Sequence, residues 1–446
     1  MSILLEIFLF LGIYFPLFHI LNIIFIRKNK NNININDYKK ISILIPCYNE
    51  EKIIKNTIDG LLRINYKNYE CLFINDGSND NTFKEFKKIL NLRKINRKKI
   101  HNIDSKKVIN IYKSKRYSNI YVIDKENGGK SDALNIGINY AKYDYIATLD
   151  ADSILQVDAL KLIIGAFNNP NVIAASGIIQ ILQSFNLSEK NHKTTLKINN
   201  ILKLQTIEYI KSCFIYKASL AKLKSLLVIS GAFGVFKKDI LLKVGGYNNV
   251  LGEDLDITIK IQLLIKDTDN IIAYVPEAIC YTEGPETYRD FFKQRERWQK
   301  SFIESLFNYK HIIFRESFTK SIAFFMIIDA LFIGTISSII ILAFLPTVFN
   351  TIINNNLSHI IIYFLLFISV HLIYNITGLL IAWKYNIRYH KLDILRLIFS
   401  IILDIFYYRL IILYTIVKGT ISYFISDKSW NKVNRSGRNY NVLKKD

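Results

Sequence analysis

Four long apolar segments alternate with more polar sequence along the chain. The first is Ile3–Ile26, and three others follow in the second half at Ile322–Phe349, Ile360–Trp383 and Ile394–Ile425. About 20 consecutive apolar residues can cross the hydrocarbon core of a bilayer as a helix. The first segment lacks a basic start and a small-residue cleavage site, which argues against a removable signal peptide. The pattern predicts transmembrane helices on both sides of a long non-membrane region.

The region between these segments has a shorter hydrophobic period. Apolar runs of strand length end in polar loops, and two segments with helical periodicity, Glu51–Arg63 and Ser131–Ala141, lie between them. The strand-length runs are Ile41–Pro46, Glu70–Asn75, Tyr121–Asp124 and Tyr145–Asp150. Alternating strands and helices predict an α/β domain with a parallel sheet that helices cover.

Basic residues beside the apolar segments predict the topology. Arg27, Lys28 and Lys30 directly follow the first segment, so by the positive-inside rule the chain enters the cytoplasm there. The connection 350–359 has no Lys or Arg and should face outside. The connection 384–396 is rich in both residues and should face inside.

The last apolar segment conflicts with this topology. The tail after Ser426 is basic and should be inside, yet one crossing by Ile394–Ile425 would put it outside. The segment contains Asp404, Arg409 and Lys418 and is too short for two full crossings. A partly interfacial or re-entrant segment is one solution, and the sequence leaves the question open.

Composition supports a membrane protein. The 446 residues are 50% hydrophobic, and 59 Lys and Arg against 37 Asp and Glu give a net charge of +22. A balance this basic indicates either a nucleic-acid partner or loops that face an anionic leaflet. The apolar segments favour the second, so no nucleic acid is expected. The four cysteines are scattered, which argues against a zinc site or disulfides and favours buried thiols in a reducing compartment.

These patterns together predict six regions. They are an N-terminal transmembrane helix (1–26), a linker (27–40), a cytoplasmic α/β domain (41–288), an amphipathic interface segment (289–316), further transmembrane helices (317–425) and a basic cytoplasmic tail (426–446). Residues 90–118 are strongly basic and indicate a surface insertion, and the polar residues 183–200 indicate a second loop.

Acidic residues directly follow two of the predicted strands. Asp76 follows the second strand, and Asp150 and Asp152 form an Asp-x-Asp pair after the fourth. Open parallel sheets bind ligands at the carboxyl ends of their strands. An Asp in a turn is often structural, and for Asp76 alone that alternative stays open. Two carboxylates one residue apart can share a divalent cation, and oxygen ligands suit magnesium or manganese bridging to a diphosphate.

Two further polar sites lie at the starts of helical segments. Glu253 and Asp254 are adjacent acids that by themselves fit helix capping. Beside the other acids, one of them is a candidate general base that deprotonates a hydroxyl acceptor. Gly128-Gly129-Lys130 begins another helix, and a Gly-rich turn with a lysine at a helix N-terminus can hold an anion. Its spacing is not that of a P-loop.

Gln294, Arg297 and Trp298 follow an amphipathic stretch just before the membrane. Juxtamembrane Arg and Trp residues are often interfacial anchors. The functional alternative is that Arg297 neutralises a leaving diphosphate and that Trp298 stacks on a sugar ring.

Taken in this order, these residues resemble glycosyltransferase family 2. The resemblance is closest to its membrane-bound processive branch, which includes poly-N-acetylglucosamine, hyaluronan, chitin and cellulose synthases. It covers residues 40–310 and implies a GT-A, Rossmann-like nucleotide-sugar domain flanked by transmembrane helices. The short motifs are weak one by one and specific as an ordered set.

The resemblance implies a nucleotide-sugar site in the first half of this region. Pro46, Tyr48 and Glu50 belong to a segment similar to the strand and loop that hold the nucleotide base. Asp76 matches the acid that contacts the uridine. Lys130 matches the lysine near the nucleotide phosphates.

The resemblance also implies the catalytic groups. Asp150 and Asp152 match the metal-and-diphosphate motif, with Asp152 as the direct metal ligand. Glu253 and Asp254 match the catalytic-base motif, with Asp254 as the base. The QxxRW motif of the processive branch, at the acceptor and diphosphate end of the site, matches Gln294, Arg297 and Trp298.

Three further stretches resemble bacterial poly-N-acetylglucosamine synthases, namely Gln205–Tyr209, Ser230–Phe233 and Pro285–Thr287. They make UDP-N-acetylglucosamine the favoured donor. The sequence also departs from the family, because residues 90–118 exceed the usual spacing and Gln180 stands where many relatives carry a basic residue.

The implied reaction is an inverting transfer from a UDP-sugar to a growing β-linked polysaccharide, with magnesium or manganese as cofactor. Membrane segments would offer the product an export path lined by polar groups such as Asp329, Asp404 and Arg409, because charges at membrane depth are costly and commonly functional. The expected partners are the UDP-sugar, a polysaccharide or lipid-linked acceptor and the bilayer of the plasma membrane. The need for a small membrane partner subunit stays open.

Two alternatives remain. One is an enzyme that adds a single sugar to a polyprenyl phosphate or glycolipid, against which the QxxRW motif argues. The other is a non-catalytic membrane scaffold with a sugar-nucleotide fold. The intact Asp-x-Asp pair and Asp254 argue against that scaffold.

Overall fold

The computed structural model describes residues 3–24, 39–185, 194–343, 346, 358–425, 437–438 and 440. The chain forms two compact units that alternate along the sequence. The helical unit comprises residues 1–29, 193–227 and 285–434, and the sheet unit comprises residues 30–192, 228–284 and 435–446. Most of the predicted linker and tail lies outside the described residues, so the six predicted regions stay a prediction.

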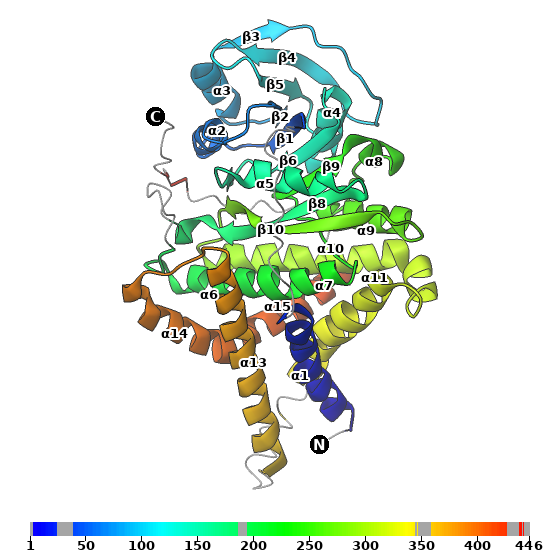
Figure 1. Cartoon of the computed structure of the whole chain (residues 1–446), viewed down its shortest axis with the longest axis vertical. Helices are drawn as coiled ribbons and strands as arrows, with labels where there is room; N and C mark the ends of the chain where they lie inside the picture. Colours follow the sequence, from blue (N-terminus) through cyan, green and yellow to red (C-terminus); the bar gives the residue numbers. More distant parts are fainter. Residues whose placement is uncertain are drawn as a thin grey trace. The chain divides into compact units, whose positions relative to one another are not determined.

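The sheet unit is built on a ten-stranded mixed sheet (Figure 1) with the order β3-β4-β5-β2-β1-β6-β9-β8-β10-β7. The strands β5, β2, β1 and β6 are parallel neighbours. The strand bounds are β1 Ile41–Cys47, β2 Tyr69–Asp76, β3 Leu92–Ile95, β4 Val108–Ser114, β5 Ile120–Lys125, β6 Tyr145–Leu149, β7 Ser153–Leu155, β8 Val172–Ile181, β9 Phe233–Lys237 and β10 Ile271–Thr282. These four neighbouring parallel strands are the ones that the sequence predicts.

Burial explains why these segments form strands. Ile43, Leu44 and Ile45 of β1 are fully buried, as expected for a strand in a parallel sheet that is covered on both faces. Its neighbouring helices bury one apolar stripe each, for example Ile54, Ile58 and Leu61 of α2. The helices of this unit are α2 Ile54–Leu62, α3 Thr82–Leu90, α4 Lys130–Tyr140, α5 Ala159–Gly165, α8 Lys238–Lys243 and α9 Glu253–Ile265.

The basic insertion is an ordered part of the sheet unit. Its ends form the antiparallel strands β3 and β4, which extend the sheet beyond β5. The segment between them lies on α4. The Asn139 side chain donates to the carbonyl of Ile103 and accepts from its N–H, each at 2.8 Å. The N–H of Lys106 donates to Asp132 at 2.8 Å. Through these hydrogen bonds the insertion stabilises the position of α4, the helix that begins at Lys130.

The helical unit collects three separated parts of the chain. Its elements are α1 Ile3–Ile24, α6 Asn200–Lys211, a π-helical turn Ser212–Lys217, α7 Ala218–Lys222, α10 Tyr288–Arg315, α11 Ser321–Phe324, a π-helical segment Phe325–Ile336, α13 Ser358–Lys384, α14 Ile394–Leu403, a π-helical turn Asp404–Tyr408 and α15 Arg409–Ile425. Residues 194–227, within the predicted α/β segment, belong to this unit. Of the polar loop 183–200, residues 186–193 lie outside the described residues.

Four stretches of the described residues are long and apolar enough to span a membrane. They are Glu6–Ile24, Ser321–Ala343, Ile361–Lys384 and Lys391–Ile425. These stretches coincide with the four apolar segments of the sequence and identify a membrane protein. The predicted outside connection 350–359 lies almost wholly beyond the described residues.

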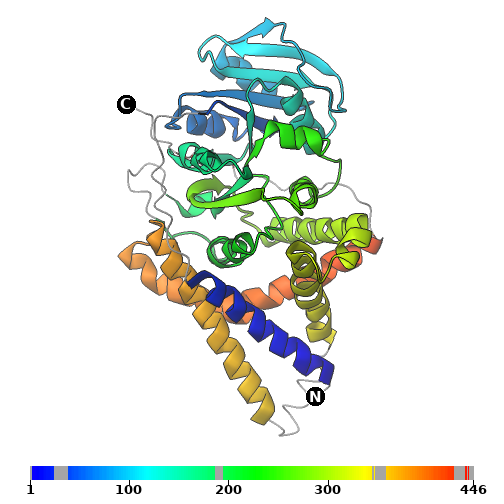
Figure 2. The same cartoon turned by 45° about the vertical axis from the view of Figure 1, so that its right-hand side comes forward.

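The last stretch bends away from the direction of its neighbour. Figures 1 and 2 both show α14 and α15 crossing α13, and α15 packs along the amphipathic helix α10. A π-helical turn, Asp404–Tyr408, joins α14 to α15, and such bulges bend helices. Whether this segment crosses the membrane or lies at its interface stays a prediction.

Polar residues in the membrane helices are paired within the helical unit. Asp329 lies 3.2 Å from the ring of His19. Asp404 accepts from Lys211 and from the Asn375 amide. Pairing lowers the cost of charge at this depth. The export role of these polar groups stays a prediction.

Candidate active site

The candidate site begins at the carboxyl ends of the parallel strands. The loop after β1 is tied to the loop after β2, because the N–H of Asn49 donates to Ser78 at 3.0 Å and that of Glu50 donates to Thr82 at 2.7 Å. Pro46 lies in β1, and the partly exposed Tyr48 and the buried Glu50 follow it. The three base-binding candidates therefore lie together at this edge of the sheet.

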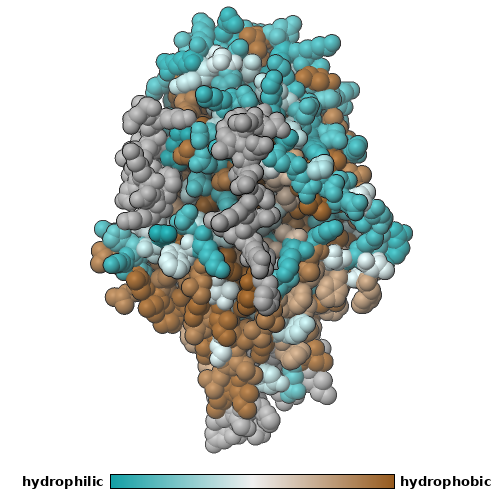
Figure 3. All heavy atoms as spheres, in the orientation of Figure 1, coloured by the Kyte–Doolittle hydropathy of each residue, from teal (hydrophilic) through white to brown (hydrophobic). Residues whose placement is uncertain are grey.

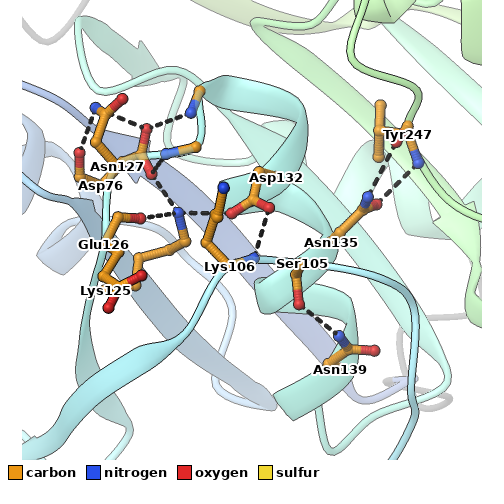
Figure 4. A network of polar contacts seen from close by, with 12 residues as sticks. Asp76, Ser105, Lys106, Lys125, Glu126, Asn127, Asp132, Asn135, Asn139 and Tyr247 are labelled. Atoms are coloured by element: carbon orange, nitrogen blue, oxygen red, sulfur yellow. Dashed lines mark hydrogen bonds and ion pairs between the residues drawn. The ribbon is translucent and has the colours of Figure 1, made fainter.

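Asp76 ends β2 and holds the glycine-rich loop after β5. Its carboxylate accepts the N–H groups of Gly128 at 3.0 Å and Gly129 at 2.8 Å. It also accepts from Lys125 and, at 3.3 Å, from the Asn127 amide (Figure 4). The side chain is buried. Asp76 is thus a structural anchor of the loop, which is the alternative that the sequence left open, and its predicted contact with a uridine stays a prediction.

Lys125 completes this anchor, and it is absent from the residues singled out by sequence. Its ammonium lies between Asp76 and Asp132, with 2.6 Å to the latter, and donates to the carbonyl of Glu126. The side chain is 0% exposed. A lysine at the end of an apolar strand was the available signal, because a buried ammonium needs a carboxylate partner.

Two glycines adopt positive φ angles beside Asp76, Gly77 in the loop after β2 and Gly129 in the loop after β5. Gly77 has φ +63°, and a Cβ there would lie 2.8 Å from the backbone nitrogen of Asn127. Gly129 has φ +89° and precedes the first residue of α4. Glycine adopts such angles without steric cost. The chain can therefore turn from β5 into α4 with its N–H groups directed at Asp76.

Lys130 begins α4 and joins three of the candidate segments. Its ammonium lies 2.7 Å from Asp150 and 2.8 Å from Glu253. Burial lowers the pKa of Lys130, but the surrounding carboxylates outweigh that effect and raise the pKa above its ordinary value. The lysine is thus fully charged. The structure brings together the Gly-Gly-Lys, Asp-x-Asp and Glu-Asp motifs, although Lys130 and Asp254 are 124 positions apart in the sequence.

Asp254 lies in the first turn of α9 beside this cluster. Its carboxylate accepts the N–H of Leu255 at 2.9 Å and that of Gly231 at 3.3 Å. Burial and then the charge of Glu253 raise the pKa of Asp254, against the opposing effect of Lys130. A carboxylate with a raised pKa is a stronger base than an ordinary Asp.

Asp152 lies directly before β7 and two residues after Asp150. Its Oδ1 accepts from the hydroxyls of Ser153 and Thr282, both at 3.2 Å. Thr282 ends β10, so two strands fix this carboxylate. Asp150 is more accessible, with 28% of its side chain exposed.

The acidic residues fit a divalent cation only in company with a ligand. Among the described residues, no group of three His, Cys, Asp or Glu side chains is arranged to hold a metal. Magnesium is commonly bound by one or two carboxylates together with substrate phosphates. The carboxylate oxygens of Asp150 and Asp152 match this combination of protein carboxylates with substrate phosphates. Together with Glu253 and Asp254, these acids also carry more negative charge than the single positive charge of Lys130.

Asn135 and Tyr247 connect the two helices of the site. The Asn135 amide donates to the carbonyl of Tyr247 at 2.9 Å and accepts its N–H at 2.8 Å (Figure 4). Burial and then Glu253 raise the pKa of Tyr247. This bridge fixes α4 relative to the segment before α9, and hence Lys130 relative to Glu253.

The QxxRW residues lie in α10 of the helical unit. Trp298 is 41% exposed, and the Arg295 guanidinium lies 4.2 Å from its ring centroid. Arg295 makes two hydrogen bonds to Glu208, at 2.8 and 2.7 Å, and Glu208 also accepts from Tyr408. Arg295 and Glu208 thus fix the indole, although the sequence motif singled out only Gln294, Arg297 and Trp298. The expected role of those three with the acceptor stays a prediction.

All four cysteines are buried thiols, as predicted. Burial and then the charge of Glu50 raise the pKa of Cys47. Burial also raises the pKa of Cys280, which lies near Asp150 and Asp152. Neutral thiols of this kind are poor nucleophiles and metal ligands, so they serve as packing residues.

Two family models match the chain. The model described as Glycosyl transferase family 2 matches residues 42–245. The model described as Glycosyl transferase family group 2 matches residues 145–417. The second match covers more than half of the chain and extends from the sheet into the apolar helices.

Curated relatives are similar over part of their length. Residues of this chain are 32% identical over 282 positions to a poly-beta-1,6-N-acetyl-D-glucosamine synthase of Staphylococcus aureus (strain COL), covering 63% of this chain and 58% of the relative. The protein of the same name from Staphylococcus epidermidis is 32% identical over 269 positions, covering 60% and 55%. The match thus spans little more than half the length of these relatives.

A solved structure has a similar fold. It is the mannosyltransferase PcManGT from Pyrobaculum calidifontis in complex with GDP-Man and Mn2+, with a TM-score of 0.56, 13% identity and coverage of 95% of this chain and 97% of that chain. At this identity the similarity concerns the fold alone. It confirms the predicted α/β fold of the GT-A type with flanking apolar helices.

Proposed function

Because this chain belongs to glycosyl transferase family group 2, we propose that it transfers sugar residues from a UDP-sugar to a growing β-linked polysaccharide at the plasma membrane. The proposed donor is UDP-N-acetylglucosamine. The name of the relatives, poly-beta-1,6-N-acetyl-D-glucosamine synthase, supports both the polysaccharide product and the N-acetylglucosamine donor. The proposed acceptor is the chain end of the polysaccharide.

The observation that carries the proposal is the position of Lys130 beside Asp150, Glu253 and Asp254. A charged lysine at a helix N-terminus suits a diphosphate. Acids on two sides of it suit a cation and a general base. A non-catalytic scaffold would have no need to keep this combination of charges in one partly open cluster.

In the proposed reaction, an acceptor hydroxyl oxygen attacks the anomeric carbon of the donor. The bond from that carbon to the diphosphate oxygen breaks with its electron pair, so the configuration inverts and UDP leaves. Asp254 takes the proton of the attacking hydroxyl, for which its raised pKa is suited. Lys130 stabilises the charge that develops on UDP.

A divalent cation, magnesium or manganese, fits the acids at the carboxyl end of β6. Asp150 and Asp152 would hold it, with Asp152 fixed by Ser153 and Thr282. When bound, such a cation neutralises diphosphate charge. The Mn2+ in the similar mannosyltransferase structure supports this choice.

The proposed orientation puts the sheet unit and the connection 384–396 in the cytoplasm. The basic residues of that connection support it. An interfacial α15 that follows α10 would keep the basic tail on the cytoplasmic side, which removes the conflict between charge and crossing number. The roles proposed for Gln294, Arg297 and Trp298 at the acceptor rest on the sequence motif.

The test is a transfer assay on membranes that contain the full chain. UDP-N-acetylglucosamine, UDP-glucose and UDP-glucuronate, each radiolabelled, are supplied with magnesium or manganese, and products are separated by size. High-molecular-weight label from UDP-N-acetylglucosamine is expected. Label confined to a small lipid fraction would indicate the single-addition enzyme, and no transfer from any donor would contradict the proposal.

A second assay tests the metal assignment. Asp152→Ala should remove the dependence of nucleotide binding on magnesium or manganese, measured by titrating UDP with each cation present or chelated. The matched control is Asp144→Asn, since that carboxylate lies at the surface with 95% of its side chain exposed. An unchanged metal response of Asp152→Ala would exclude Asp152 as a ligand.

A further inference from the structure

An apolar groove lies at the end of α13 in the helical unit. It has a volume of about 250 Å³ and is lined by residues of α13, of the following corner and of α14, among them Leu380, Trp383, Tyr389 and Leu397. Figure 3 shows apolar side chains gathered over α13 and α14. Trp383 and Leu380 are more than half exposed. The groove therefore opens on a surface of two candidate membrane spans.

The corner that forms one wall of the groove is fixed by hydrogen bonds. Asn386, with φ +65°, lies in the turn after α13, and the N–H of Ile387 donates back to the carbonyl of Ala382 at 3.1 Å. Thr194 donates through its N–H, at 3.0 Å, and through its hydroxyl to the carbonyl of Arg388. Hydrogen bonds to backbone carbonyl groups thus hold this wall of the groove in place.

Several polar groups in or next to the groove have no partner among the residues that the structure describes. The Tyr389 hydroxyl is buried and has no hydrogen-bond partner among the described residues, and burial raises its pKa so that it stays protonated. Lys384, Arg388 and Lys391 are exposed, and no described residue forms an ion pair with them. In contrast, Arg396 is paired with Asp393 at 2.6 Å. An apolar groove therefore meets a hydroxyl donor and uncompensated positive charge.

We propose that this groove binds one anionic phospholipid, with an acyl chain along Leu380, Trp383 and Leu397 and the headgroup phosphate at Lys384, Arg388 and the Tyr389 hydroxyl. Basic pockets between membrane helices bind anionic headgroups. Trp and Tyr side chains are enriched at this level of a bilayer. The charge of the corner selects an anionic lipid over a zwitterionic one. The proposal does not depend on glycosyl transfer.

The experiment uses Trp383 as the reporter. The full chain with Trp298→Phe and Trp430→Phe keeps Trp383 as its single tryptophan, and it is placed at one copy per phosphatidylcholine nanodisc. Brominated phosphatidylglycerol or brominated phosphatidylcholine is then titrated, and quenching of the Trp383 emission is measured. We expect half-quenching at a mole fraction about fivefold lower, or more, for the anionic lipid, as one engaged basic residue provides.

Paired variants then test the headgroup contact. Lys384→Gln with Arg388→Gln should abolish the preference for the anionic lipid. Arg93→Gln with Lys94→Gln, on the exposed edge strand β3, removes the same charge from the sheet unit and should leave the preference intact. High salt should also reduce the preference of the parent chain, which is a readout that needs no folded variant.

Three results would overturn the proposal. Equal quenching by both lipids would mean that the groove takes any acyl chain. Quenching by neither lipid would mean that protein covers the groove, as in contact with a second copy. A preference that survives Lys384→Gln with Arg388→Gln would remove these residues from the headgroup contact.

Discussion

Two lysines five residues apart, Lys125 and Lys130, have the same kind of partners and different surroundings. Each ammonium lies between two carboxylates. The Lys125 side chain is 0% exposed, whereas that of Lys130 is 35% exposed. Around Lys125, the carboxylates also accept backbone N–H groups from Gly128, Gly129 and Lys106. The first cluster is complete in itself, and the second is accessible to a ligand.

The difference teaches how a buried charge can be assigned to structure or to function. At Lys125 the two carboxylates share one ammonium and also accept backbone N–H groups, so these buried groups have protein partners, as stability requires of buried ions. At Lys130 the acids exceed the cations and one carboxylate, Asp254, has a raised pKa. Perturbed groups in an open cluster mark functional sites. Lys125, before the pair Gly128-Gly129, therefore stabilises the fold, whereas Lys130, after that pair, serves the proposed chemistry.

The largest expected effect comes from the acid beside Lys130. Asp254→Asn should lower the turnover number about 10²–10⁴-fold, the usual contribution of a general base, while UDP-sugar affinity stays within about twofold. The melting temperature should be unchanged or higher, because the raised pKa means that the ionised form is disfavoured in the folded protein. Turnover near that of the Asp144→Asn control would remove Asp254 from the base role.

The next effect separates the two lysines by activity. Lys130→Met should reduce kcat/KM about 100-fold or more, as loss of one electrostatic group at a developing charge does, with a near-normal melting temperature. The control is Lys107→Met, an exposed lysine of the insertion. A Lys130→Met protein that melts early and keeps its activity when folded would reverse the assignment.

Lys125→Met should act on stability. Removing one partner of a buried ion pair costs about 3–5 kcal/mol, so the melting temperature of the sheet unit should fall well below that of Lys107→Met. Thermal unfolding and limited proteolysis measure this directly. Normal stability with lost activity would show that Lys125, too, belongs to the reacting site.

The smallest effect is a shift in pH dependence. The profile of kcat/KM reports groups of the free enzyme. Its acidic limb should lie above the ordinary range of an Asp, since activity needs Asp254 ionised and its pKa is raised. Glu253→Gln removes a negative neighbour, which lowers the Asp254 pKa, so the limb should move to lower pH. A limb that stays in place, or moves upward, would contradict the coupling of these two acids.

Local sequence was sufficient for much of this. The apolar run Ile41–Pro46 and the period of the segments after it predicted the parallel strands, because burial on both faces is written in continuous apolar sequence. The acids Asp150, Asp152 and Asp254 are site candidates in the sequence because they follow strands or begin a helix. Each of these signals is contained in a few consecutive residues.

Other features depend on contacts between distant residues. Lys125 appeared as one more lysine of a basic chain, and only the fold brings it between Asp76 and Asp132. Glu208 is 87 residues from Arg295, so their pairing has no local pattern. The direction of α15 could not be predicted for the same reason. Counts of Lys and Arg in the loops predict which side of the membrane each loop faces, but they do not predict that α15 packs along α10.

The anchoring of Gly128 and Gly129 by Asp76 has a consequence for how quickly and at what cost a nucleotide binds. The loop proposed to face the phosphates is held by protein hydrogen bonds before any ligand arrives, so little conformational entropy would be lost at the moment of association. The ordering of that segment is accomplished during folding, by the carboxylate of Asp76 and the buried Lys125. If a nucleotide binds there as proposed, the association rate should be set by diffusion and charge, with no slow ordering step.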